Sequence, residues 1–481
     1  MYGGTIMATG TAHTITTGAG FALSGNITIG DSASGAYQLA FGEAITSTGN
    51  YTITNDSTAG LALSGVGLSN SSTARTLTFD GSGTTTVNGA IANTGTTKSN
   101  SSTGTVGTAT SGNVIKNGSG TLVLNGTNTY TGSTTINDGE LDVNGSLASE
   151  TVTVASTSIL AGSGTLSGIV TDSGSISGSL TFNSDVTINY GATASAAAFN
   201  GNITNSGSIT SDVTVQSGKM LTVNPTGAIT GNVTLNSGAN AYTQATSLQG
   251  NIVNSGTIHN DITVAANKVL SGSGSITGAL TVSLGATVKG SNTISGALGG
   301  SGSVSPGTDS STGILTTASL ASGNSLSFNF RLSTTSVDYT TSYNDVLHVT
   351  SSSEGLSLSS SNSISIYFSS LTEATLLASG NIYEGTFYVD GLSASTLLAE
   401  FNSANVTYYV LDSAGAITYD GQTYSVLNFS YVSVSTTTVS TSLGDGSTLE
   451  FTVVPEPSTW AMLVGGTGSL LVFRGARRRN S

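Results

Sequence analysis

The sequence predicts an all-β protein whose larger part is a parallel β-helix, a solenoid of stacked coils. Short runs that alternate apolar and polar residues recur between Gly, Asn and Asp turns along most of the chain, as half-buried strands do. Related phrases return at steps of about 20 residues, the length of one solenoid coil. Only 7% of the 481 residues are charged and 64 are Gly, a balance that favours turns and strands over helices.

The first part of the chain consists of short predicted strands. Each is an alternating run bounded by turn residues, so one face is expected inside and the other outside. Residues 94–112 are almost entirely Thr, Ser, Gly and Asn, and they predict a low-complexity loop that leaves the stack. The strands predicted before this loop are 12–16, 21–24, 26–29, 37–44, 51–54, 61–64 and 76–79.

Residues 113–145 form the clearest repeat. They contain predicted strands at 114–116, 121–124 and 133–136 and a fourth that begins at Glu140, and Gly residues or Asn-Gly pairs separate them. The segment resembles the autotransporter-associated β-strand repeat of bacterial passenger domains, which implies a parallel β-helix. The matching residues are Lys116, Gly118, Gly120, Thr121, Leu122, Leu124, Gly126, Tyr130, Gly132, Thr134, Ile136, Gly139 and Leu141.

Repeated phrases extend the solenoid to residue 305. Phrases of the type Asn-Ser-Gly-Ser-Ile begin at Asp172, Asn205 and Asn254. A solenoid coil can bury its apolar edge only against neighbouring coils, so the recurring aliphatic residues are expected to point inward, with Asn and Ser ladders at the corners. The residues expected inside include Leu122, Leu124, Ile136, Ile209, Ile229, Ile258 and Ile276.

The composition changes after residue 305. The turn-rich stretch 306–324 predicts a linker, and residues 325–453 predict a separate, smaller β-sandwich-like domain that caps the solenoid. Ten of the 16 Tyr and seven of the 13 Phe lie in that domain, enough aromatic surface to fill a two-layer core. Its predicted strands include 325–330, 364–368, 386–389, 406–411 and 425–434.

The last segment, 454–481, has three successive parts. A rigid motif is followed by an apolar run at 460–473, and the chain then becomes basic. The motif is Pro455, Glu456, Pro457 and Ser458. The apolar run includes Trp460, Met462, Leu463, Val464, Leu470, Leu471, Val472 and Phe473. The basic end holds Arg474, Arg477, Arg478 and Arg479, which would stay on the cytoplasmic side of a membrane.

This order resembles the PEP-CTERM sorting signal of Gram-negative bacteria that make exopolysaccharide. The resemblance implies export, recognition by a membrane protease of the exosortase class, and release of the body to the cell surface or matrix. The apolar run spans only about 21 Å as a helix against roughly 30 Å of hydrocarbon, so we expect a transient transmembrane anchor.

An exported protein is expected to begin with a basic segment and an apolar segment of about 7 to 15 residues. Residues 1–7 contain no Lys or Arg, and short predicted strands follow them directly. We therefore expect either that translation starts upstream or that the chain is a fragment.

Few residues suggest catalysis. The chain has no Cys, and His13, His259 and His348 lie far apart in sequence, so we expect no enzyme activity, cofactor or metal site. Asp212 and Asp261 occupy equivalent positions of two repeats and could stack as paired carboxylates, but we interpret them as solvated corner residues.

The charge balance limits the partners. Residues 1–453 carry 24 acidic and 7 basic side chains, or 17 net negative charges, which disfavours nucleic acid. The leading hypothesis is an exported structural or adhesive protein that associates with exopolysaccharide or with other surface proteins. The alternatives are a β-helix carbohydrate-active enzyme, which requires clustered carboxylates, and an autotransporter-like adhesin, against which the single apolar run and basic end argue.

Overall fold

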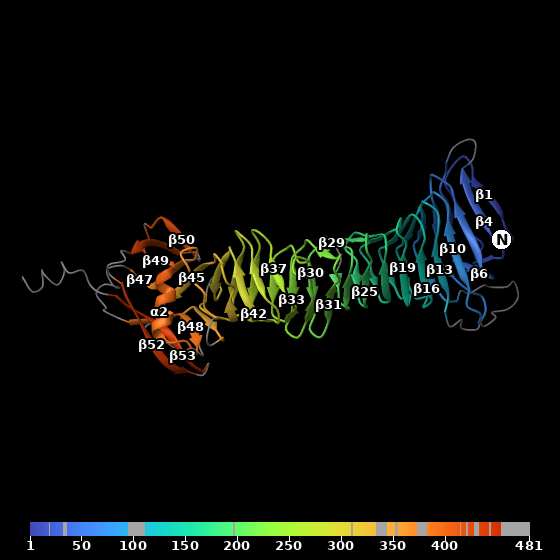
Figure 1. The fold of residues 1–481 in the computed structure, drawn as a ribbon. Helices are drawn as coiled ribbons and strands as arrows, with labels where there is room; N and C mark the ends of the chain where they lie inside the picture. The colour runs from blue at the N-terminus through green and yellow to red at the C-terminus, as the bar shows by residue number, and fades with distance from the viewer. Residues whose placement is uncertain are drawn as a thin grey trace, which may run out of the picture. The chain divides into compact units, whose positions relative to one another are not determined.

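The computed structural model describes residues 1–18, 20–31, 36–94, 111–195, 198–308, 311–332, 344–351, 355–372, 382–413, 415–419, 422–427, 432–441 and 444–453. The chain divides into two compact units, residues 1–250 and residues 251–481. Both are built mainly from β-strands, as the sequence predicts (Figure 1).

The strands of the first unit follow one another in groups of three, one strand for each face of a coil. The first face holds β1 (Gly4–Ala8), β4 (Ile27–Asp31), β7 (Tyr51–Asn55), β10 (Thr76–Asp80), β13 (Asn113–Lys116), β16 (Ser133–Ile136), β19 (Thr151–Val154), β22 (Ile169–Asp172), β25 (Val186–Ile188), β28 (Ile203–Asn205), β31 (Met220–Val223) and β34 (Asn240–Tyr242). The second face holds β2 (His13–Ile15), β5 (Leu39–Phe41), β8 (Leu61–Leu63), β11 (Thr85–Val87), β14 (Thr121–Leu124), β17 (Glu140–Val143), β20 (Ile159–Gly162), β23 (Ser175–Ile176), β26 (Thr193–Ala194), β29 (Ser208–Ile209) and β32 (Ala228–Ile229).

The strands of the third face belong to three different sheets. Its strands are β3 (Phe21–Leu23), β6 (Ile45–Ser47), β9 (Val66–Gly67) and β12 (Ile91–Ala92), then β15 (Thr127–Asn128), β18 (Ser146–Leu147), β21 (Thr165–Leu166), β24 (Thr181–Phe182) and β27 (Ala198–Phe199), and finally β30 (Val213–Val215) and β33 (Val233–Leu235). Within each of these sheets a strand pairs in parallel with the equivalent strand of the next coil, as β13 does with β16 and β28 with β31. Val114 faces Thr134 and Ile203 faces Leu221, so a coil takes 18 to 20 residues there.

The core of each unit lies inside the coils. Side chains alternate between inside and outside along each strand, and the inward set consists mainly of Val, Ile, Leu and Phe. Every residue that the sequence predicts to point inward has no exposed surface, which confirms the inward set from Leu122 to Ile276. The predicted repeat strands are also confirmed, as β13, β14, β16 and β17.

The second unit begins with coils of three strands. β35 (Ile252–Asn254), β36 (Thr257–His259) and β37 (Ile262–Val264) are followed by β38 (Val269–Gly272), β39 (Ser275–Ile276) and β40 (Leu280–Val282). The next coil has β41 (Thr287–Gly290) and then one long strand, β42 (Thr293–Gly300). β42 pairs with both β39 and β40, so two faces become one. From this point the coils have two sides.

The two-sided coils include residues of the predicted linker and of the predicted aromatic-rich domain. Residues 306–324, predicted as a linker, contain the strand β44 (Ile314–Leu320), which pairs in parallel with β42 and with β46 (Val346–Val349). The opposite sheet runs in parallel from β43 (Ser303–Pro306) through β45 (Ser327–Leu332) and β47 (Ser363–Thr372) to β49 (Asn405–Leu411). The aromatic core expected between two layers is present, since Phe387 contacts Phe328 and Phe330 at ring-centroid distances of 5.4 and 5.1 Å.

Parallel pairing ends in antiparallel strands. β48 (Ile382–Asp390) pairs in parallel with β46 on one side and antiparallel with β53 (Gly444–Val453) on the other, and β53 pairs antiparallel with β52 (Val432–Thr441). On the other sheet β49 pairs antiparallel with β51 (Gln422–Leu427), which pairs with β50 (Ile417–Tyr419). The helix α2 (Ala394–Ser403) buries Leu397 and Phe401, and the Phe401 ring lies 5.9 Å from that of Phe451 on β53. The sequence did not predict this helix.

Two predicted features lie wholly or mostly outside the described residues. They are the tail 454–481 and the low-complexity loop 94–112, of which residues 95–110 are not described. None of the helices in the described part of the chain has the length and the apolar content that a membrane crossing requires.

The inward position of Ile209 gives a test of the solenoid. Replacing Ile209 by Asp puts a charge without a counter-ion into a core position with no exposed surface, so we expect the free energy of unfolding to fall by roughly 3 kcal/mol or more. Thermal denaturation followed by circular dichroism measures the change. The matched control is Thr204→Asp, on the outer side of β28, which we expect to cost far less; equal losses at the two positions would contradict the inside–outside assignment.

Candidate functional site

A buried lysine closes one corner of the repeat at 113–145. Lys116 is only 3% exposed, and its Nζ donates hydrogen bonds to the carbonyl oxygens of Asn117, Gly118 and Asp138 at 2.8, 2.7 and 3.1 Å. Burial lowers the pKa of Lys116, and the charge of Asp138 acts against this shift. Because these carbonyls belong to successive coils, the ammonium group holds two corners together.

The close approach of these corners requires Gly139. Its φ of +68° lies in the left-handed region, and a Cβ atom there would lie 2.8 Å from Lys116 Nζ. A second buried network lies nearby: the Tyr130 hydroxyl and Thr134 Oγ1 are 2.6 Å apart, and Thr134 Oγ1 donates to Ser149 Oγ at 2.9 Å. The matched residues Lys116, Tyr130, Thr134 and Gly139 therefore maintain the coil.

Asn ladders stack at the outer corners, as the sequence predicts. Asn125 Nδ2 donates to Asn88 Oδ1 at 3.1 Å, and Asn144 Nδ2 donates to Asn125 Oδ1 at 3.3 Å. A similar pair joins Asn137 to Asn117 at 2.9 Å. Such side-chain amides bond to the equivalent residue of the next coil, so each coil continues the ladder of the coil before it.

The outer side of the first face carries a ladder of threonines, which we name the Thr ladder. Its members are in-register partners on β16, β19, β22, β25, β28 and β31, and each side chain is at least partly exposed. Neighbouring strands lie about 4.8 Å apart, so hydroxyl and methyl groups repeat at that spacing. The members are Thr135, Thr153, Thr171, Thr187, Thr204 and Thr222.

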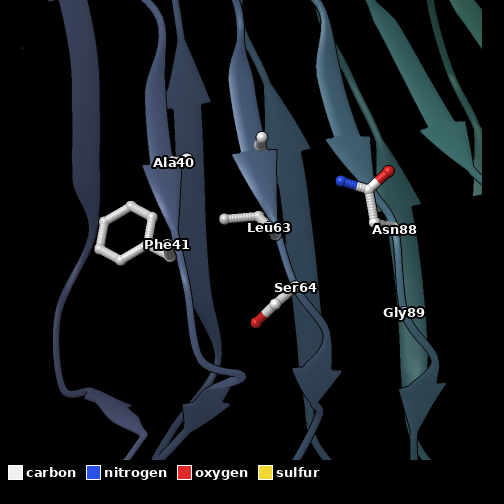
Figure 2. A pocket seen from close by; sticks show the side chains of 7 residues that line it. Ala40, Phe41, Leu63, Ser64, Asn88 and Gly89 are labelled. Atoms are coloured by element: carbon white, nitrogen blue, oxygen red, sulfur yellow. The ribbon is translucent and has the colours of Figure 1, made fainter. Parts of the chain in front are cut away.

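A shallow groove crosses three successive coils of the first unit. It has a volume of about 330 Å³ and is lined by residues at the ends of β5, β8 and β11. Ala40 and Ala62 supply small apolar surface, and Ser64 and Asn88 supply a hydroxyl and an amide. Figure 2 shows these side chains on neighbouring coils, with the amide nitrogen of Asn88 on the side of Leu63. The lining contains no charged side chain.

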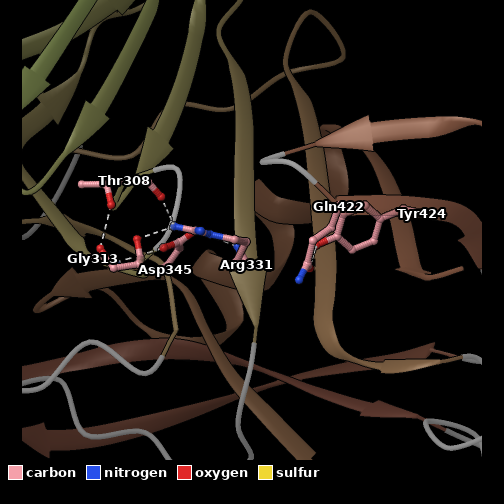
Figure 3. A network of polar contacts seen from close by, with 7 residues as sticks. Thr308, Gly313, Arg331, Asp345, Gln422 and Tyr424 are labelled. Carbon is pink, nitrogen blue, oxygen red and sulfur yellow. Dashed lines mark hydrogen bonds and ion pairs between the residues drawn. The ribbon is translucent and has the colours of Figure 1, made fainter. Parts of the chain in front are cut away.

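The second unit contains a buried ion pair. Arg331 on β45 and Asp345, just before β46, are 7% and 0% exposed, and Arg331 Nε lies 3.3 Å from Asp345 Oδ2. The carboxylate also accepts from the backbone N–H groups of Arg331 and Gly313 at 2.8 and 3.0 Å, while the guanidinium donates to the carbonyl oxygen of Thr308 (Figure 3). Burial raises the pKa of Asp345, and Arg331 acts against this shift. The pair joins Thr308 and Gly313 to two strands.

A cluster of tyrosine rings lies beside this pair. The rings of Tyr409 and Tyr419 stack on the ring of Tyr367 at centroid distances of 4.7 and 4.1 Å, and Tyr424 meets Tyr367 edge to face at 5.0 Å. The Tyr424 hydroxyl donates to Gln422 Oε1 at 3.0 Å (Figure 3). These contacts hold the antiparallel strands β50 and β51 against β47.

The structure separates the residues considered for catalysis. His13 hydrogen-bonds to the Thr9 carbonyl in the first unit, and His348 Nε2 lies 3.0 Å from Asp390 Oδ1 in the second. Asp212 and Asp261 lie in different units, and each accepts a backbone N–H of the following coil at 2.8 Å, which agrees with corner roles. Within the described ranges no three His, Asp or Glu side chains are grouped closely enough to hold a metal ion.

The predicted processing residues, from Pro455 to Arg479, lie outside the described residues, so the structure does not place them. Sequence reasoning missed the Arg331–Asp345 pair and the Thr ladder. The pair has only a weak signal, because its members are 14 residues apart and each occurs among uncharged neighbours. The Thr ladder has a sequence signal that could have revealed it, because a Thr recurs near the middle of successive predicted strands.

Comparison with known proteins supports the repeat. Residues 114–143 match the family model described as passenger-associated-transport-repeat, which agrees with the resemblance found at 113–145. Such a repeat occurs in autotransporter-type β-helices and implies an exported surface or extracellular protein. No curated protein matches the chain.

The buried ion pair gives a second stability test. Replacing Arg331 by Met leaves the Asp345 carboxylate buried without its counter-ion, and we expect a loss of about 3–5 kcal/mol in the stability of the second unit. Chemical denaturation followed by near-ultraviolet circular dichroism of the Tyr cluster measures this. The double variant Arg331→Met/Asp345→Leu should recover part of the loss. A single variant as stable as the wild type would show that the pair is dispensable.

Proposed function

We propose that this protein is an exported structural or adhesive protein of the cell surface or matrix, and that its coils associate with exopolysaccharide. The observation that carries the proposal is the Thr ladder on a passenger-type β-helix. A polysaccharide with a repeating unit can bind along a surface whose polar and apolar groups also repeat. The Thr ladder offers a donor, an acceptor and a methyl group in every coil from β16 to β31.

The charge of the chain favours a neutral polymer. The net charge of residues 1–453 is −17, and neither the Thr ladder nor the groove at Ala62 carries a cation that would attract an acidic polysaccharide. The groove adds apolar surface flanked by Ser64 and Asn88, a combination that suits the C–H and hydroxyl groups of a sugar. We propose a neutral glucan-type chain as the ligand class.

We propose no enzymatic activity. A β-helix glycosidase or lyase requires carboxylates within about 5–10 Å of each other, or a base beside one, in a groove. The described groove is lined by Ala, Phe, Leu, Ser, Asn and Gly. A carbohydrate-active enzyme is therefore the weaker alternative. Release of reducing sugar from purified polysaccharides by the full chain would support it.

We further propose that the tail is a sorting signal. In this proposal an exosortase-type membrane protease recognises Pro455-Glu456-Pro457, the apolar run at 460–473 holds the chain in the membrane transiently, and the arginines keep the end in the cytoplasm. The prolines support it, because they donate no backbone hydrogen bond and cannot continue the preceding strand β53. The repeat match favours a second candidate, an autotransporter-like passenger protein, whose export would not depend on Glu456.

Ligand binding is tested by cosedimentation of the full chain with an insoluble neutral glucan. The variant Thr171→Val/Thr187→Val removes two neighbouring hydroxyls and keeps the strand shape, so we expect affinity to fall by about tenfold, or 1.4 kcal/mol. The control is Thr214→Val, an exposed threonine on β30 outside the Thr ladder. Binding that is absent in the wild type, or equal in the ladder variant and the control, would contradict the proposal.

Tail processing is tested in a host that has an exosortase-type protease. We expect the mature surface protein to lack Arg474 to Arg479, and Glu456→Ala or Pro457→Ala to leave the full-length chain in the membrane fraction; peptide mass spectrometry and fractionation measure both. The control is Glu450→Ala, an acidic residue on β53 outside the motif. Mature protein that keeps residues 454–481 at full abundance would rule out processing.

A further inference from the structure

Three turns of the solenoid share one local pattern and differ in one side chain. Asp172, Asn205 and Asn254 each precede Ser-Gly, and none of the three side chains has exposed surface. In each turn the glycine two residues later donates its backbone N–H to the side-chain Oδ1, at 2.9, 3.0 and 3.2 Å respectively. The three turns therefore use the same geometry, with an acid in one and an amide in two.

The second side-chain atom distinguishes the acid from the amides. Asn205 Nδ2 donates to the Ala228 carbonyl of the next coil at 3.0 Å, and Asn254 Nδ2 donates to that of Ser275 at 3.2 Å. The corresponding atom of Asp172 is Oδ2, which is buried and has no hydrogen-bond partner.

The strand register identifies the group that Oδ2 should face. Ser175 pairs with Thr193 as Ser208 pairs with Ala228, so the carbonyl of Thr193 occupies the place of the acceptor. A carboxylate oxygen cannot donate to a carbonyl oxygen unless it carries a proton.

The surroundings of Asp172 offer no compensating charge. Its in-register neighbours are Val154 and Ile188, both buried. Between residues 143 and 211 the other charged side chains are the carboxylates of Glu150 and Asp185, which are exposed at corners. Burial accordingly raises the pKa of Asp172 from 3.8 to about 6, and the hydrogen bond from Gly174 acts against this shift.

We propose that Asp172 is a proton-binding site that closes its coil under acidic conditions, with Oδ2–H donating to the Thr193 carbonyl, and that loses this bond as the surroundings approach neutrality. The proton comes from water and returns to water. Once it is lost, a buried carboxylate faces a carbonyl oxygen without a cation, and local opening of the coil lets water reach it.

The direction of the pH effect follows from linkage. Because the folded pKa lies above the unfolded value of 3.8, the folded coil binds more protons between about pH 4 and pH 6. Protection of the coil is therefore highest below about pH 4, falls through that window and is constant above it. The full change corresponds to roughly a hundredfold in the opening equilibrium, since one proton contributes at most about tenfold per pH unit.

Hydrogen exchange of the full chain, read by mass spectrometry, tests the proposal. The exchange rates are first corrected for their intrinsic pH dependence. The opening equilibrium reported by peptides that cover 169–188 should then be up to about a hundredfold larger at pH 7 than at pH 4. In Asp172→Asn the amide can make the bond found at Asn205, so the same peptides should stay protected at both pH values. Identical pH profiles in the wild type and Asp172→Asn would overturn the proposal.

The chain provides a matched gain-of-effect variant. Asn205→Asp places an acid between the in-register neighbours Ile188 and Val223, which are apolar like the neighbours of Asp172. Peptides around 203–223 should then lose protection at neutral pH in the same way. Infrared difference spectra give an independent readout. The carbonyl band of a protonated carboxylic acid at pH 5 should be weaker in Asp172→Asn than in the wild type, and an unchanged band would overturn the assignment of the proton.

Discussion

Parallel backbone pairing between successive coils is the interaction on which the rest of the structure depends. No coil of 18 to 20 residues can bury its own apolar edge, so each is stabilised only where its strands meet those of the coils before and after it. Parallel pairing also determines the other features of the coils. It stacks Leu on Leu and Val on Val inside, aligns the Thr ladder outside, and brings corners so close that only Gly fits at positions such as Gly139.

At the corners this pairing leaves polar groups that need other hydrogen-bond partners. The chain supplies these partners in three ways. Exposed corners use Asn ladders such as Asn88, Asn125 and Asn144. Buried turns use an inward Asn that joins its own turn to the next coil, as Asn205 does. One crowded corner uses the ammonium group of Lys116. An acid in place of the inward Asn, as at Asp172, keeps the turn but makes the contact with the next coil depend on a proton.

The sequence predicts the coils well because inward and outward positions alternate and the corners carry Gly and Asn. Residues from Leu122 to Ile276 were assigned correctly on that basis alone. The change from three sides to two was missed because the sequence around Gly296 resembles that around Gly278. Gly296 lies inside the strand β42, whereas Gly278 lies at a corner between β39 and β40. The Arg331–Asp345 pair was missed because its members are 14 residues apart among uncharged neighbours, and burial of a charge has no local sequence signal.

The coil length has a consequence for how such a chain changes over generations. Because each strand pairs with its equivalent in the next coil, gain or loss of one whole coil of 18 to 20 residues preserves every inward and outward assignment on both sides of the junction. A change of one residue within a strand instead moves its inward side chains to the surface. Length therefore varies most easily in whole-coil steps, and each added coil lengthens the Thr ladder by one hydroxyl wherever its outer strand carries a threonine.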